Sequence, residues 1–135
     1  MELVVDANIL FSDLIKDSFI ANLIFNKNLV LYTPEFIIDE FFKYKNYILN
    51  KTSRSEEDYI KISHMLKYKI NVIPKEEYKE FIDDAEKISP DEKDIIYFAL
   101  ALKLNCAIWS GDKKIKEQDR IKIYSTEELT KLIKK

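Results

Sequence analysis

The stretch ELVVDAN, residues 2–8, places a short, valine-rich apolar run directly before an aspartate. A run of this kind predicts a buried strand, and Asp6 then stands at the carboxyl end of that strand. Asp6 alone has two interpretations, because an aspartate in this position either caps a helix or turn or belongs to a site. Asn8 adds a second polar side chain that can orient a ligand or a metal-bound water.

Four further strand-like segments follow along the chain, and helical patterns separate them. Strands are predicted at Leu29–Tyr32, Ile70–Ile73, Cys106–Trp109 and Ile121–Tyr124. Helices are predicted over Asn8–Lys16, Asp17–Asn26, Thr33 to about Leu49, Ser55 to about Tyr68, Lys75–Glu86, Ser89 to about Leu104, and from Ser125 onward. Their predicted caps are Thr33, Ser55, Ser89 and Ser125. This alternation is typical of an α/β sandwich with a mostly parallel sheet.

The composition narrows the class of protein. The 135 residues are 47% hydrophobic and include one glycine and three prolines, which predicts a single domain over residues 1–135. The net charge of −2 neither indicates nor excludes a nucleic-acid partner. Lysines of the C-terminal third, among them Lys113, Lys114 and Lys116, are interpreted as a solvated surface. One cysteine, no signal-peptide pattern and no membrane-spanning apolar run predict a cytoplasmic protein without membrane contact.

Two aspartates follow the carboxyl ends of predicted strands, where ligands collect in parallel sheets. Asp6 follows the first strand and Asp112 follows Cys106–Trp109, so we expect them to share a pocket despite their separation in sequence. The alternative for Asp112 is an N-cap after a turn, with Gly111 supplying backbone freedom. Ser110, two residues before Asp112, favours the site.

Glu40 interrupts the apolar stripe of the helix predicted from Thr33. The stripe consists of Phe36, Ile37, Phe41, Tyr44 and Ile48. Glu40 falls inside it, whereas its neighbour Asp39 falls on the polar face. We therefore expect Glu40 to point inward, where acids tend to mark sites. The alternative is a boundary residue whose carboxylate reaches water or pairs with a lysine.

Asp94 precedes an apolar run, residues 95–102, that has almost no polar face. A helix of this kind is largely buried, which puts Asp94 at the mouth of a core helix. With Ser89 as N-cap, the capping box and the helix dipole explain Asp91 and Glu92 in the first turn. Asp94 lies beyond that turn and is interpreted as functional. Asp91 lies on the same helix face and is a candidate fifth acid.

Carboxylates that converge in one pocket need a counter-charge, because burying them unpaired is costly. A hard divalent cation, which takes oxygen ligands, is the simplest one. The four acids therefore indicate metal-assisted phosphodiester chemistry.

Together these residues resemble the PIN domain family of metal-dependent nucleases. Asp6 stands in an Asp-Ala-Asn sequence after the first strand, and Glu40 stands in a Thr-Pro-x(5)-Glu helix. Asp94 stands in an Asp-x(4)-Ala-Leu-Ala helix, and Asp112 stands in Trp-Ser-Gly-Asp after the next strand. The resemblance lies in the ordered set of motifs and runs from residue 2 to about residue 130.

The resemblance implies a three-layer α/β/α sandwich that hydrolyses RNA with Mg²⁺ or Mn²⁺. The implied metal-binding and catalytic acids are Asp6, Glu40, Asp94 and Asp112. Asn8 and Ser110 fall at the family's supporting polar positions. Many small members are VapC-like toxins of toxin–antitoxin pairs, and these are usually homodimers. An antitoxin protein and a second copy of the chain are therefore the expected partners, beside the RNA substrate.

Two other functions fit parts of the sequence. Phosphotransfer of the haloacid-dehalogenase type also places an aspartate after the first strand, but it requires a second aspartate where Asn8 stands. A non-catalytic PIN-like module that binds protein or RNA is the other alternative, and the four acids argue against it. The single histidine, His64, lies in a mid-chain helix and is interpreted as a core or surface residue.

Overall fold

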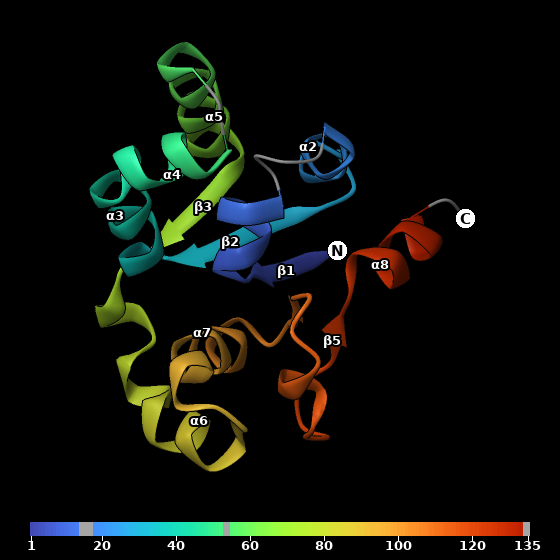
Figure 1. Ribbon diagram of the computed structural model, residues 1–135. Coiled ribbons are helices and arrows are strands. Elements are labelled where there is room, and N and C mark those ends of the chain that lie inside the picture. Colours follow the sequence, from blue (N-terminus) through green and yellow to red (C-terminus); the bar gives the residue numbers. More distant parts are fainter. Residues whose placement is uncertain (14–17, 53–54, 134–135) are drawn as a thin grey trace.

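The structure is a computed structural model that describes residues 1–13, 18–52 and 55–133. The described part contains a five-stranded sheet in the order β3-β2-β1-β4-β5 (Figure 1). The strands are β1 Glu2–Val5, β2 Val30–Pro34, β3 Ile70–Ile73, β4 Ala107–Trp109 and β5 Ile123–Tyr124. Neighbouring strands are parallel throughout, which confirms the predicted α/β class with a parallel central sheet.

The order of the strands reverses between β1 and β4. From β1 the chain moves outward to β2 and β3, and it then crosses to the opposite side of β1 to form β4 and β5. Such a reversal leaves a crevice at the carboxyl ends of the two central strands. Val5 is in register with Trp109, so Asp6 and Ser110 leave the sheet side by side.

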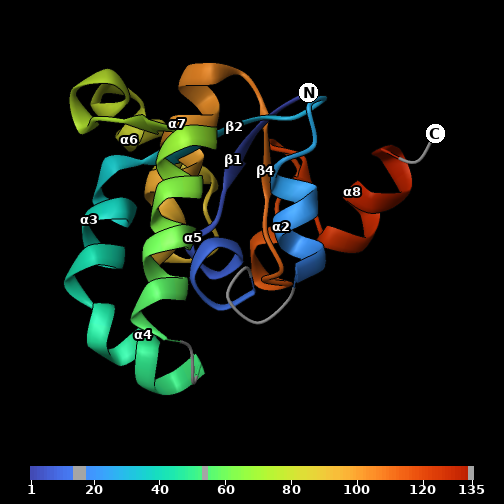
Figure 2. The same cartoon turned by 90° about the horizontal axis from the view of Figure 1, so that it is seen from above.

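Helices cover both faces of the sheet and form the outer two layers. One face carries α2 Ser18–Ile24, α3 Glu35–Lys43, α4 Lys45–Thr52 and α5 Glu56–Lys69, and the other carries α6 Ile82–Ile88 and α7 Ile95–Leu104 (Figure 1). Figure 2 looks onto the face that α2 and α5 cover. The last helix, α8 Thr126–Ile133, packs beside β5.

Helix α7 is the core helix that the apolar run predicts. It packs against β1, β2 and β4, and Phe98, Ala99, Leu100 and Ala101 are fully buried. Asn105 ends the helix in the left-handed conformation with φ of 53°, a role that asparagine tolerates well. The chain then enters β4. Helix α7 therefore carries Asp94 at its start and leads into β4 at its end.

The helix predicted from Thr33 to Leu49 begins later and is broken. Pro34 disfavours the helical conformation of the residue before it, so Thr33 stays in β2 and its Oγ1 donates to the carbonyl of Val5 at 3.4 Å. Pro34, not Thr33, precedes the first helical residue. Tyr44 then separates α3 from α4.

Three other predicted helices differ in detail. Lys75–Glu86 forms short 3₁₀ turns at Lys75–Glu77 and Lys79–Phe81 before α6 begins. In place of the first helical pair, the described residues form a π-helical turn, Ile9–Asp13, and α2. The predicted junction of that pair, residues 14–17, lies outside the described residues.

Two predicted caps are confirmed. Ser55 caps α5, because its Oγ accepts from the backbone N–H of Asp58 at 3.1 Å. Ser125 and Glu128 form a reciprocal capping box at α8, with both hydrogen bonds at 3.1 Å. Both helices start where the sequence predicts, and within the described residues no helix is long and apolar enough to cross a membrane.

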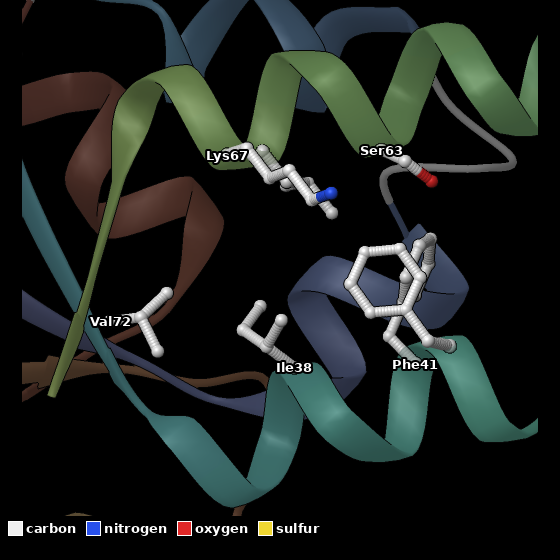
Figure 3. A pocket seen from close by; sticks show the side chains of 7 residues that line it. Ile38, Phe41, Ser63, Lys67 and Val72 are labelled. Atoms are coloured by element: carbon white, nitrogen blue, oxygen red, sulfur yellow. The ribbon is translucent and has the colours of Figure 1, made fainter. Parts of the chain in front are cut away.

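A small apolar pocket lies between α3 and α5 (Figure 3). It measures about 10 Å³ and is lined by Ile38, Phe41, Phe42, Ser63, Leu66, Lys67 and Val72. The ammonium of Lys67 lies 4.9 Å from the ring centre of Phe42 at its rim. The volume admits about one water molecule, and no carboxylate lines the pocket, so it is a packing gap rather than the predicted site.

Candidate functional site

Asp6 is held rigidly at the carboxyl end of β1. Its side chain is 4% exposed, and both of its carboxylate oxygens accept hydrogen bonds. Ser110 Oγ donates to Oδ2 at 2.6 Å, and the backbone N–H of Asn8 donates to Oδ1 at 3.0 Å. The Asp6 backbone N–H also donates to the Trp109 carbonyl at 3.0 Å. The predicted meeting of the β1 and β4 ends therefore occurs through Ser110.

Asp112 joins the same network through the backbone. Its N–H donates to Ser110 Oγ at 3.1 Å, and its Oδ1 accepts from the N–H of Lys114 at 3.0 Å. The side chain is half-buried. Gly111 does not have a positive φ, and a Cβ there would meet nothing within 4 Å. The expectation that Gly111 supplies unusual backbone freedom is therefore wrong, since the turn depends on Ser110 and Asp112.

Asp91 is the residue that caps the entry to α7. Its Oδ1 accepts from the N–H of Lys93 at 3.0 Å and starts a 3₁₀ turn, Glu92–Asp94, ahead of the α-helix. The predicted capping box from Ser89 is wrong, because Ser89 ends α6 and its Oγ donates to the Asp91 carbonyl at 2.6 Å. Both residue types are good caps, and the extra turn moves the helix start towards Asp94.

Asp94 is buried at the start of α7 among other acids. The side chain is 8% exposed, and burial is the largest cause of its raised pKa, about 6. The negative charges of Asp6, Asp112 and Asp91 raise this pKa further, while the positive charge of Lys114 opposes them. Asp94 therefore lies within the electrostatic reach of both strand-end acids, as the sequence predicts.

Glu40 acts electrostatically on Tyr97 of α7, a residue on which Asp6 and Asp94 also act. The buried Tyr97 hydroxyl accepts from the backbone N–H of Ala7 at 3.0 Å. Burial raises the pKa of Tyr97, and the charges of Asp6, Asp94 and Glu40 act in the same direction. Glu40 is half-buried and Asp39 is exposed, in agreement with the predicted facing of α3.

Two residues of the predicted apolar stripe, Phe36 and Tyr44, do not face inward, so the prediction is wrong for them. Phe36 is 56% exposed and Tyr44 is 47% exposed, and the buried residues of this helix are Ile37 and Phe41. Phe41 stacks on Tyr59 of α5 with ring centres 4.9 Å apart, so this pair fixes which side of α3 faces inward. The buried face of α3 is therefore narrower than the apolar stripe in the sequence indicates.

Neither the histidine nor the cysteine takes part in this network. His64 is exposed on α5, which settles its predicted alternatives in favour of the surface. Cys106 is half-buried ahead of β4, and burial raises the pKa of its thiol to about 11. A neutral thiol at pH 7 is neither a good nucleophile nor a metal ligand.

The donor chemistry of the site suits a hard divalent cation, although its side chains do not form a closed cage. Within the described part of the chain, no three His, Cys, Asp or Glu side chains are grouped closely enough to hold a metal ion by themselves. Mg²⁺ needs few protein carboxylates, because it keeps several waters and takes substrate phosphate oxygens. The buried Asp94 with acids around it is the observation that fits a cation here.

Two residues of the site are absent from the sequence-based prediction. Tyr97 lies three residues after Asp94 on the same helix, so the spacing alone can find it. Lys114 extends to Asp91 across the site, with Nζ 3.9 Å from Oδ2. Nothing in the sequence distinguishes Lys114 from Lys113 or Lys116, because its contact depends on the fold.

Comparisons with known proteins bear on the family and the fold of the chain. The family model described as "PIN domain" matches residues 4–132. Among solved structures, the chain is similar to the crystal structure of VapBC2 from Rickettsia felis bound to a DNA fragment from their promoter. That match has a TM-score of 0.59 and 15% identity, and it covers 93% of this chain and 98% of the other. No curated protein matches the sequence. Since the family model spans nearly the whole sequence, the chain belongs to the PIN domain family.

Proposed function

We propose that this protein is a divalent-metal-dependent endoribonuclease. The observation that carries the proposal is the buried Asp94 beside the strand-end acids Asp6 and Asp112. Membership in a family of nucleases supports it. In this proposal Asp6, Glu40, Asp94 and Asp112 hold Mg²⁺ or Mn²⁺, some of them through water molecules that the ion keeps.

The remaining polar residues of the site orient these acids. Ser110 fixes one oxygen of Asp6 and the turn to Asp112. Asn8 fixes the other oxygen of Asp6 through its backbone, and Asp91 shapes the turn that presents Asp94. A bound divalent ion supplies charge stabilisation for the phosphate and acidifies a water molecule. No side chain is needed as the nucleophile. The part of the protein is to position the ion and the phosphate and to exclude other reactions.

The direct test compares Glu40→Gln with Asp39→Asn on α3. Glu40 is half-buried on α3, and Asp39 is its exposed neighbour. We expect Glu40→Gln to lower cleavage of labelled single-stranded RNA in Mn²⁺ by roughly 10²-fold or more, with an unchanged melting temperature. Asp39→Asn should cleave as the wild type does. Chelator should stop cleavage by the wild type and by Asp39→Asn. A large loss in Asp39→Asn would mean that the proposed facing of α3 is wrong.

Metal binding can be measured without knowing the RNA target. We expect millimolar Mn²⁺ to raise the melting temperature of the wild type, because a ligand that binds only the folded state stabilises it. Cleavage that needs both Mn²⁺ and Glu40 supports the nuclease. Absence of both cleavage and a metal effect would favour a non-catalytic binding module instead.

Tyr97→Phe tests how the segment after β1 is held at the site. The substitution leaves the backbone N–H of Ala7 without its acceptor, which costs about 1–2 kcal/mol. We expect unfolding in urea to show this loss and cleavage to fall by roughly 10- to 100-fold, as for other residues that orient ligands. Wild-type values for both would mean that water replaces the hydroxyl and that Tyr97 has no positioning role.

We also propose that the protein acts in the cytoplasm as the toxin of a toxin–antitoxin pair and forms a homodimer. The similar Rickettsia felis structure is a VapBC2 complex, which supports the antitoxin. Exposed aromatic residues on α3 and α4, such as Phe36 and Tyr47, support a protein-binding surface. Sedimentation of the purified chain tests the dimer, and co-purification with the product of an adjacent small gene tests the antitoxin.

A further inference from the structure

Lys114 bridges two segments that together frame the acids. Its backbone N–H donates to Asp112 Oδ1 at 3.0 Å, so the residue is anchored in the turn after β4. Its Nζ lies 3.9 Å from Asp91 Oδ2, in the turn before α7. The side chain therefore spans from the strand-end part of the site to the helix-start part.

Lys114 is the cation of this acid group in the described part of the chain. The other ion pairs found there join Lys45 to Glu56 and Lys116 to Glu128, which are not site residues. The charge of Lys114 also acts on Asp94, because it opposes the effect of the neighbouring acids on that carboxyl group. A single lysine thus offsets part of the charge of several carboxylates.

The contact between Lys114 and Asp91 is suited to opening. The lysine side chain is 55% exposed, and 3.9 Å is the outer edge of an ion pair. Exposed pairs of this kind contribute little to folding stability. The flexible four-carbon stem of lysine allows the ammonium to move without rearranging the backbone. The anchored main chain keeps that movement local to the site.

We infer that Lys114 is a displaceable counter-charge: it neutralises the acids in the metal-free protein and turns to the RNA phosphate when a divalent cation takes that place. The inference rests on the proposed function. A cation among the acids repels the ammonium, and the phosphodiester brings an anion to the same position. Lys114 is then a substrate-binding residue whose position depends on the metal.

Lys114→Gln is expected to strengthen Mn²⁺ binding and to weaken RNA binding. In Lys114→Gln, we expect Mn²⁺ to bind the free protein about three- to tenfold more tightly at low salt, because one competing charge is removed. The KM for single-stranded RNA should rise several-fold, because a phosphate contact is lost. Titration calorimetry measures the first value, and initial cleavage rates measure the second. The melting temperature should stay as in the wild type.

Lys113→Gln is the matched control. Lys113 is adjacent and exposed, and no ion pair within the described residues involves it. Lys113→Gln removes the same charge from the same loop. The Mn²⁺ affinity and the KM of this variant should remain near the wild-type values. Equal effects in Lys113→Gln and Lys114→Gln would overturn the inference, since they would report only net charge.

Other outcomes separate this inference from the proposed function. Wild-type protein that binds Mn²⁺ and cleaves RNA, together with an unchanged or weaker Mn²⁺ affinity in Lys114→Gln, overturns the inference alone. An unchanged KM in Lys114→Gln also overturns it. Wild-type protein that neither binds Mn²⁺ nor cleaves RNA overturns both the proposed function and the inference.

Discussion

Asp94→Asn is expected to abolish RNA cleavage and, at the same time, to stabilise the metal-free protein at neutral pH. The amide keeps the size of the side chain but removes a charge from the start of α7, where the carboxyl group is 8% exposed. Loss of one preorganised electrostatic group at a reaction centre typically costs roughly 10²–10³-fold in rate. Single-turnover cleavage in Mn²⁺ measures this loss.

The stabilisation follows from the raised pKa of Asp94. The pKa is 3.8 for an ordinary aspartate and about 6 in this site, so the folded protein holds the proton more strongly than the unfolded chain. Ionising the group therefore costs stability as pH rises from about 4 to about 6, and the full cost remains above pH 6. Two pKa units correspond to an effect on the order of 1–3 kcal/mol.

The pH dependence provides the measurement. Urea unfolding of wild type and Asp94→Asn in chelator should give similar stabilities at pH 4 and a more stable variant at pH 7. Asp39→Asn is the control, because the exposed Asp39 lies on the polar face of α3. A difference between wild type and Asp94→Asn that does not depend on pH would contradict this account of the buried acid.

Trp109→Ala is expected to cause the largest loss of stability. Trp109 is fully buried on β4, and its indole N–H donates to Thr126 Oγ1 of α8 at 3.0 Å. Removing an indole from a core costs about 3–5 kcal/mol, which is a large part of the roughly 5–15 kcal/mol that holds a domain folded. Urea unfolding at pH 7 measures the loss.

The same residue connects the core to the site. The Trp109 carbonyl accepts from the backbone N–H of Asp6, and Ser110 follows directly. Trp109→Phe keeps a buried ring and removes the indole N–H, so it should cost less than half as much as Trp109→Ala and retain cleavage. Wild-type stability in Trp109→Ala would show that β4 and α8 are held together without the indole.

The sequence alone predicts the parallel sheet. It also predicts that the carboxyl ends of the two central strands, β1 and β4, lie side by side. Alternating strands and helices predicted the parallel sheet, and the rule on strand carboxyl ends placed Asp6 beside the segment 110–112. The actual link is a side-chain hydrogen bond from Ser110, whose partner is set by the register of β1 and β4. Local patterns supply the position of such a residue but not its partner.

Local patterns failed where two neighbouring residues compete for one structural role. Ser89 and Asp91 are both good caps, and the choice of Asp91 depends on how the turn packs between α6 and α7. The side chain of Lys114 reaches Asp91 only because the fold brings two distant turns together. Contacts of that kind depend on tertiary structure, so periodicity and capping rules do not predict them.

The site joins residues that the ribosome adds far apart in time. Asp6 precedes its hydrogen-bond partner Ser110 by 104 residues, so it is synthesised long before Ser110 and Asp112. Strand β4 must then insert beside β1, a contact between distant residues that forms late in folding. The acid group therefore cannot assemble on the nascent chain until the residues between Asp6 and Asp112 have been synthesised and β4 has paired with β1.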